Sequence, residues 1–276
     1  MATNAAEILE ASSATGAIGR FIDRWIFVFM AALFIAVTLL GFVPASIDYI
    51  GLVKAHVRPP IPVVFHFHAV LMGSWLLLLL TQGTLVAVGR TALHRQLGVV
   101  SVLLLPAIVV AGVLIVQAQW RELQGNILAP HGFAPAQIAV FKGTIVKLLV
   151  LQTRMLIVFP ALVVWALLLR AKDSQAHKRL MILATVIPLG AGLGRALDFL
   201  GAPENFGPPF FYLDLYSVVI LLPLLIYDVV RQRPVQRAYI IWGACFVSSA
   251  VAMYLVAGSS WWALVAPRLM GMRGWS

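Results

Sequence analysis

The sequence predicts an all-α integral membrane protein, a bundle of about seven transmembrane helices, and two observations support this prediction. Of its 276 residues, 62% are hydrophobic and only 11% are charged, and the mean hydropathy is +0.97. Soluble domains are about 45–50% apolar and about 25% charged. The apolar residues also gather into segments of about 20 residues, the length that crosses the hydrocarbon core of a bilayer. This pattern excludes an ordinary soluble enzyme, a disordered protein and a disulfide scaffold.

Each apolar segment is predicted to be a helix, because backbone groups in lipid need hydrogen-bond partners within their own segment. The segments are residues 21–43, 62–88, 97–117, 144–169, 180–200, 210–230 and 238–257. Residues 1–20 are then an N-terminal cytoplasmic segment and residues 21–257 the transmembrane domain. Residues 258–276 form a tail too short to span again, and we expect it at the membrane interface, where tryptophan and arginine are favoured (Trp261, Trp262, Arg268, Arg273 and Trp275).

The formal net charge of +10 comes largely from basic residues between the apolar segments. This pattern is a topology signal, so no nucleic-acid partner is expected. The positive-inside rule places the more basic side in the cytoplasm; that side holds the N-terminus and Arg20, Arg24, Arg90, Arg95, Arg170, Lys172, Lys178, Arg179, Arg231, Arg233 and Arg237. The outer side holds Lys54, Arg58, Arg121, Lys142, Arg268 and Arg273. The sequence therefore predicts a multi-pass protein of the cell inner membrane, with the lipid bilayer as its main partner.

A short pattern occurs twice along the chain. His94 and His177 each begin the pattern His-basic-x-Leu just before or at the start of an apolar segment, and a proline follows eleven or twelve residues later (Pro106 and Pro188). Both copies fall at the same point of consecutive helical hairpins. The second and third segments, and the fourth and fifth, are therefore predicted to be duplicated hairpins.

The same two histidines form the first candidate site. His94 and His177 precede helices that run in the same direction, so both are expected at one depth near the cytoplasmic side. Imidazoles from two helices at one depth are what a bis-His b-type haem requires, and Arg95, Lys178 and Arg179 would meet its propionates. Alternatively, both histidines are ordinary interfacial residues beside basic neighbours.

The second candidate site consists of polar residues within the spans, which cost about 2.5–3.5 kcal/mol each and therefore face the bundle or a cavity. His68, Trp75 and Gln82 recur every seven residues and share one helix stripe, from which His66 is excluded. Arg154 is expected near mid-membrane. An outward-facing cavity for an anionic or quinone-like ligand is predicted from His68, Trp75, Gln82, Lys147, Arg154, Arg195 and Asp198, with Asp214 nearby.

The polar residues of the second candidate site can also be explained by structural roles alone. Arg195 and Asp198 are three residues apart and can form a local ion pair on one helix. Lys147 and His66 can extend their polar ends toward the headgroups. Arg154 is the hardest residue to explain in this way, because no water is near at mid-membrane depth.

Three stretches carry a resemblance to known proteins: FHFHAVLMGSW at 65–75, GRTALHRQLG at 89–98 and AHKRLMILAT at 176–185. They resemble motifs of a family of bacterial polytopic membrane proteins with no assigned activity, over about residues 60–235. More distantly, the paired hairpins are similar to multi-helix b-type cytochromes. That resemblance implies at most one haem, through His94 and His177, because the fourth segment carries no second outer histidine.

The sequence thus leaves three functional hypotheses. The first is a haem-binding electron-transfer protein of the inner membrane with a redox partner. The second is a transporter or binding subunit with an outward-facing polar cavity. The third is an accessory or assembly subunit of a larger membrane complex. The sequence assigns no residue a catalytic role.

Overall fold

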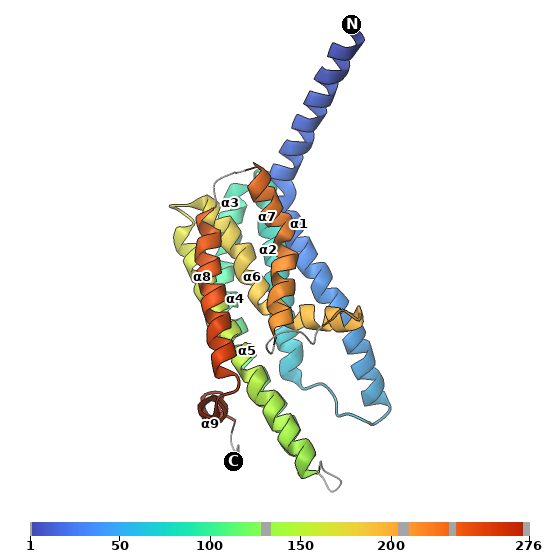
Figure 1. The fold of residues 1–276 in the computed structure, drawn as a ribbon, viewed down its shortest axis with the longest axis vertical. Helices are drawn as coiled ribbons and strands as arrows, with labels where there is room; N and C mark the ends of the chain where they lie inside the picture. The colour runs from blue at the N-terminus through green and yellow to red at the C-terminus, as the bar shows by residue number, and fades with distance from the viewer. Residues whose placement is uncertain (1, 128–133, 204–209, 232–235, 273–276) are drawn as a thin grey trace.

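The computed structural model describes residues 2–127, 134–203, 210–231 and 236–272, and these form nine helices and no strand (Figure 1). In chain order they are α1 (Ala2–Lys54), α2 (Val63–Ala87), α3 (Thr91–Gly98), α4 (Val100–Ile127), α5 (Pro135–Leu169), α6 (Ser174–Phe199), α7 (Phe211–Arg231), α8 (Arg237–Val256) and α9 (Ser260–Leu269).

Seven spans long and apolar enough to cross a membrane are present, which confirms the predicted architecture. The third of these spans joins α3 and α4, which are separated only by Val99. Helix ends were the less accurate part of the prediction. The first span was expected at 21–43, but α1 is 53 residues long and passes residue 20 without a break. Apolar composition marks the part of a helix that lies in lipid, whereas backbone hydrogen bonds continue into polar sequence.

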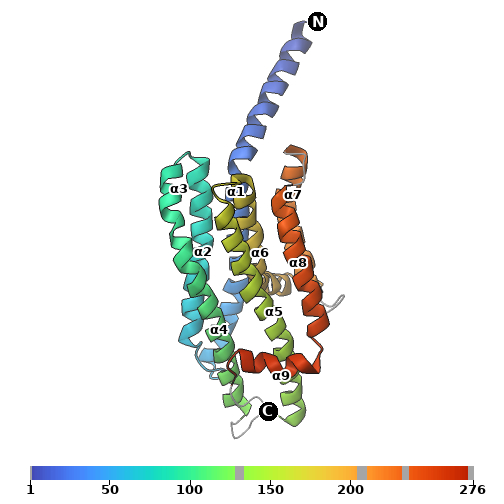
Figure 2. The same cartoon turned by 90° about the vertical axis from the view of Figure 1, so that its left-hand side faces the viewer.

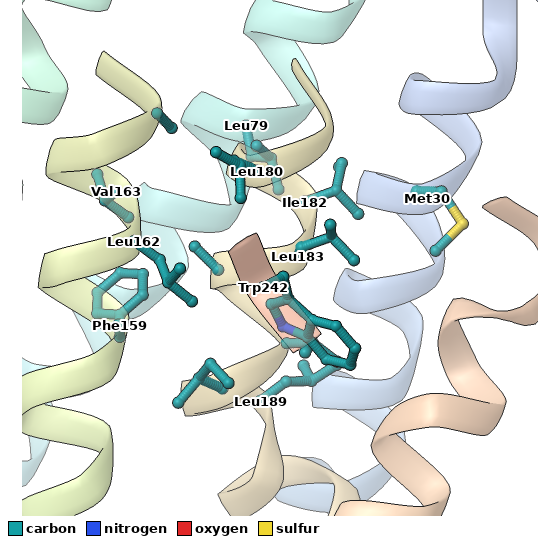
Figure 3. Packing of buried hydrophobic residues seen from close by; sticks show 14 of the residues in the cluster. Met30, Leu79, Phe159, Leu162, Val163, Leu180, Ile182, Leu183, Leu189 and Trp242 are labelled. Atoms are coloured by element: carbon teal, nitrogen blue, oxygen red, sulfur yellow. The ribbon is translucent and has the colours of Figure 1, made fainter. Parts of the chain in front are cut away.

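Helix α6 is the centre of the bundle. Of its most apolar stretch 72% is buried, against 17–39% for the other six spans. Helices α1, α5, α7 and α8 pack around it, and α2 and α4 extend the bundle beyond α1 and α5. Figure 3 shows Leu180 and Leu183 of α6 between Leu162 of α5 and Met30 of α1. These four side chains are fully buried.

The closest helix crossing joins α1 and α6 through two glycines. A Cβ on Gly41 would overlap the carbonyl oxygen of Gly192, and a Cβ on Gly192 would lie 3.3 Å from Cα of Thr38. Small residues let helix backbones approach in a membrane, where packing replaces the hydrophobic effect as the driving force. The glycine pair therefore allows α1 and α6 to pack in direct backbone contact.

Large apolar side chains cover much of the outer surface. Leu103, Leu168, Val229 and Leu255 are each more than 70% exposed, and they lie on four different helices. An exposed apolar surface of this extent suits lipid rather than water. Together with the seven spans, it identifies a multi-pass membrane protein.

The tail folds into α9, which runs crosswise over α5 toward α4, and both of these helices extend beyond it (Figure 2). Two contacts attach it to these helices. Trp262 donates its indole N–H to the carbonyl oxygen of Val146 at 3.0 Å, and Gln117 donates to the carbonyl oxygen of Met270 at 3.3 Å. Trp261 remains exposed, so its ring is free to contact the membrane interface, as the sequence predicts for the tail.

Candidate functional site

Helix α7 carries two aspartates, Asp214 near its start and Asp228 near its end. Each pairs with an arginine on a neighbouring helix and with a tyrosine on α8. At 1.5 Å per residue, their fourteen-residue separation corresponds to about 21 Å along the helix. We call the first group the outer cluster (Arg154, Asp214, Phe246, Ser249 and Tyr254) and the second the inner cluster (Gln175, Arg179, Asp228 and Tyr239), after the predicted orientation.

The outer cluster joins α5, α7 and α8. Arg154 Nη1 donates to Asp214 Oδ1 at 2.5 Å, and the Tyr254 hydroxyl donates to Asp214 Oδ2 at 2.6 Å. Arg154 Nε donates to Ser249 Oγ at 3.0 Å, and Nη2 to the carbonyl oxygen of Phe246 at 3.2 Å. The guanidinium also lies 4.6 Å from the centre of the Phe246 ring. Arg154 is 7% exposed, so this charge is held inside the protein.

Local sequence explains how these groups meet. Phe246 and Ser249 are three residues apart and lie on the same side of α8, and Tyr254 follows near the end of that helix. Asp214 lies in the first turn of α7, where the positive end of the helix dipole favours a carboxylate. Arg154 lies about midway along α5 and has no other carboxylate within ion-pair distance among the described residues.

A small pocket opens beside Arg154. Its lining comes from four helices: Leu151, Arg154 and Met155 of α5, Ile187 and Gly190 of α6, Leu213, Asp214 and Ser217 of α7, and Phe246 of α8. It has room for about one water molecule. Arg154 uses three of its five N–H groups in the hydrogen bonds above, and the other two have no partner among the described residues. The pocket is therefore lined by a buried cation that does not use all of its hydrogen-bond donors within the described residues.

The inner cluster also combines an arginine, an aspartate and a tyrosine, but its arginine has fewer N–H groups without a partner among the described residues. Arg179 is 0% exposed and donates to Asp228 through Nε at 2.7 Å and Nη2 at 2.5 Å. Its Nη1 reaches both the carbonyl and the side-chain oxygen of Gln175. The Tyr239 hydroxyl donates to Asp228 Oδ2 at 2.5 Å. Four of the five N–H groups are thereby used, as in a structural clamp.

The other charged residues of the predicted cavity do not line this pocket. Lys147, Arg195 and Asp198 are exposed, and none lines the pocket beside Arg154. Arg195 donates to the carbonyl oxygen of Ala191 at 2.8 Å, and no ion pair with Asp198 is present among the described residues. Arg154 is instead neutralised by Asp214, so the outer cluster carries no net charge.

The stripe of His68, Trp75 and Gln82 does not reach this pocket either. Trp75 is buried, donates its indole N–H to Thr185 Oγ1 at 3.1 Å and meets the Phe159 ring edge-on. His68 is half-buried, and its Nδ1 has no hydrogen-bond partner, whereas His66 is exposed. Trp75 thus packs the core between α2, α5 and α6, while Gln82 belongs with His94.

His94 and His177 lie near each other at the predicted cytoplasmic ends of α3 and α6. They are within range of electrostatic interaction, as are His177 and Arg170. The Nδ1 atom of His177 is 2.8 Å from the carbonyl oxygen of Ala166. A hydrogen bond there fixes the ring and leaves Nε2 unprotonated in the neutral form, the arrangement usual for a metal-bound histidine.

His94 fits a metal or haem less well because of Gln82. In the amide orientation that satisfies both of its ends, the Gln82 nitrogen donates to the carbonyl oxygen of His94 at 3.0 Å and also contacts Nδ1. Its oxygen then accepts from the N–H of Gly98 at 3.0 Å. When Nδ1 of a neutral histidine accepts a hydrogen bond, Nε2 carries the proton and cannot bind a metal. The amide must turn over before His94 can be a ligand.

Two of the residues expected to meet haem propionates are engaged elsewhere. Arg179 is held in the inner cluster, and the Lys178 ammonium lies 4.8 Å from the centre of the Phe27 ring. Arg95 is exposed on α3. Among the described residues, no group of three or more His, Cys, Asp or Glu side chains is placed to hold a metal ion.

Arg154 was predicted from the sequence, but several residues of the two clusters were not. Asp228, Tyr239, Ser249 and Tyr254 were not predicted as site residues. Asp228 interrupts the apolar end of the sixth segment and was a usable signal. The roles of the tyrosines and the serine depend on which helices are neighbours, and this information is not in any single segment.

Comparison with known proteins adds no family: no protein family, curated protein or solved structure matches this chain. The class that the fold defines is therefore a seven-span, all-α membrane protein. The resemblance of its three motifs to a bacterial membrane-protein family stays a prediction.

Proposed function

We propose that this membrane protein binds a small anion inside its membrane domain, at the outer cluster, as a binding or transport subunit. One observation carries the proposal: Arg154 is buried, lines a pocket and keeps two N–H groups without partners in the part of the chain that the structure describes. An ionisable residue within the membrane is costly and is a functional candidate by default. Guanidinium N–H groups pair best with anionic oxygens, in short and strong hydrogen bonds.

Pocket size and lining support a small ligand. Space for about one water favours a small monovalent anion over a larger solute, and chloride and formate are suitable probes. The walls are mainly apolar, from Leu151, Met155, Ile187 and Phe246, and the polar groups gather at Arg154, Asp214 and Ser217.

Calorimetric titration of the purified full chain in detergent, against a background of gluconate, tests binding of formate and chloride. We expect Arg154→Gln to weaken formate binding about tenfold or more, because a hydrogen bond to a charged group contributes about 1.5–3 kcal/mol. Lys147→Gln is the matched control, since Lys147 is an exposed cation two turns earlier on α5. Equal binding by wild type and Arg154→Gln would exclude the site.

Removing Arg154 alone leaves Asp214 buried without its partner, which can prevent folding. The double variant Arg154→Gln/Asp214→Asn removes both charges and should also lose formate binding. A formate flux into liposomes that contain the wild-type protein, absent with the double variant, would identify a transporter; binding without flux would identify a binding subunit.

A second candidate function is electron transfer through a b-type haem. It is favoured by the carbonyl-anchored ring of His177 and the proximity of His94. A haem would supply one-electron redox chemistry between two membrane-bound partners. His177 fits such a role as it stands, and His94 fits with the Gln82 amide turned so that its oxygen accepts from Nδ1.

A reduced-minus-oxidised absorption spectrum of protein from haem-replete cells tests this candidate. An α-band that His177→Ala removes and His66→Ala keeps would support it; His66 is an exposed histidine outside the pair. Absence of an α-band from the wild-type protein would eliminate the haem.

A further inference from the structure

The charge balance of the outer cluster restricts how an anion can enter it. Arg154 carries one positive charge, and Asp214, at 2.5 Å, cancels it. Both side chains are largely buried, with side-chain exposures of 5% and 12%. A further anion placed there would be an uncompensated charge in a medium of low polarity, which costs several kcal/mol. Anion binding therefore needs a compensating positive charge.

Among the residues that the structure describes, no other charged side chain lines the pocket to provide that compensation. Helix α5 contributes Arg154, α7 contributes Asp214, and α8 contributes the apolar Phe246. Helix α6 contributes Ile187 and Gly190, which carry no charge. Tyr254, the other titratable group of the cluster, is already neutral as a hydroxyl that donates to Asp214.

From this geometry we infer that the site takes up one proton on Asp214 together with each small monovalent anion. The inference rests on the proposed anion binding and adds its coupling. In the balanced step, a proton passes from water to a carboxylate oxygen of Asp214, and the anion passes from water to Arg154. The Arg154–Asp214 ion pair is exchanged for an Arg154–anion pair, and the net charge of the cluster stays zero.

Two features of the cluster suit this exchange. The hydrogen bonds from Arg154 to Ser249 and to the Phe246 carbonyl do not involve Asp214. They therefore hold the guanidinium in place for the anion when the Arg154–Asp214 ion pair breaks. Ser217, one turn further along α7, lines the same pocket and offers a hydroxyl to the protonated carboxyl or to the anion.

The inner cluster lacks these features although its chemistry is the same. Asp228 binds Arg179 through two hydrogen bonds, whereas Asp214 binds Arg154 through one. Neither Arg179 nor Asp228 lines the pocket beside Arg154. The comparison assigns proton coupling to the outer cluster and a structural role to the inner one.

Proton uptake on addition of sodium formate to the weakly buffered, detergent-purified full chain tests the inference. We expect about one proton per formate bound. By linkage, uptake of a proton with each formate requires the apparent Kd for formate to rise with pH. These two measurements use the wild-type protein alone and do not depend on the folding of a variant.

The variant Asp214→Asn mimics the protonated carboxyl. We expect it to bind formate with an affinity that does not change with pH, and without proton uptake. Asp198→Asn is the matched control, because Asp198 is an exposed carboxylate near the predicted outer end of α6, and it should behave as wild type. Should Asp214→Asn fail to fold, Ser217→Ala should weaken formate binding but keep the ratio of protons to formate.

The outcomes separate the inference from the proposed function. Formate binding without proton uptake, or with a pH-independent affinity in the wild type, would overturn the coupling and leave anion binding intact. Proton uptake that persists in Asp214→Asn would also overturn it. No formate or chloride binding to the wild type at any pH would refute both.

Discussion

Arg154 and Arg179 differ in how fully their N–H groups are used, although both are buried guanidinium groups paired with an aspartate of α7. Arg179 places four N–H groups on oxygen atoms, and Arg154 places three. A buried ion pair contributes little net stability over an apolar replacement, but breaking it by removing one partner is costly. The number of free donors therefore indicates which pair is available to a ligand.

Replacing Asp228 with Asn should destabilise the protein strongly, because Arg179 would be left as a buried charge without compensation. We expect the free energy of unfolding to fall by about 3–5 kcal/mol, measured by denaturant unfolding in mixed micelles. The double variant Arg179→Met/Asp228→Leu, which removes both charges, should recover most of that loss. Equal losses in the single and double variants would show that the pair is not the source of the effect.

The seven spans were predictable from the sequence because the length of an apolar run reports directly on the bilayer. Helix ends were less predictable: α1 extends well beyond its apolar run in both directions. For the site, mid-membrane depth alone identified Arg154. Asp214 was expected nearby as a balancing charge, but its direct pairing with Arg154 did not follow from the sequence, since it depends on how α5 and α7 are placed around α6. Asp228 interrupts the end of an apolar run, and it was missed because a carboxylate at that position is easily taken for the boundary of the span.

The α1–α6 crossing gives a test at the level of helix packing. Gly41→Ala should weaken the fold markedly, because the added Cβ overlaps the Gly192 carbonyl and must push two helix backbones apart. Gly51→Ala on the same helix is the matched control, since nothing lies within 4 Å of its added Cβ. Thermal unfolding in detergent should show a clear fall in Tm for Gly41→Ala and little change for Gly51→Ala. Similar Tm values for the two variants would contradict the close crossing.

In the whole molecule, polar contacts join neighbouring helices at both ends of the bundle. The ion pair between Arg231 and Asp23, at 2.6 Å, joins α7 to α1 on the predicted cytoplasmic side. Arg24 donates to the carbonyl oxygen of Ala87 at the end of α2. On the opposite side α9 is attached to α4 and α5. The apolar surface between these two levels is the part that the bilayer covers.

Orientation can be tested through the single cysteine. In a Cys245→Ser background, Arg58→Cys and Lys172→Cys place thiols in loops at opposite ends of the bundle. We expect an impermeant maleimide added outside intact cells to label Arg58→Cys and not Lys172→Cys, because the positive-inside rule places the loop of Lys172 in the cytoplasm. The reverse labelling pattern would invert the assignment of the outer and inner clusters.

The two aspartates of α7 make different numbers of hydrogen bonds with their arginines, and this difference affects how the helix can move. Asp228 makes two hydrogen bonds with Arg179 and one with Tyr239. The Asp228 end of α7 can therefore stay in place while the rest of the helix tilts about it. Over an arm of about 21 Å, a tilt of about 5° swings Asp214 by about 2 Å. Release of the Arg154–Asp214 ion pair would therefore leave the Asp214 end of α7 freer to move than the Asp228 end.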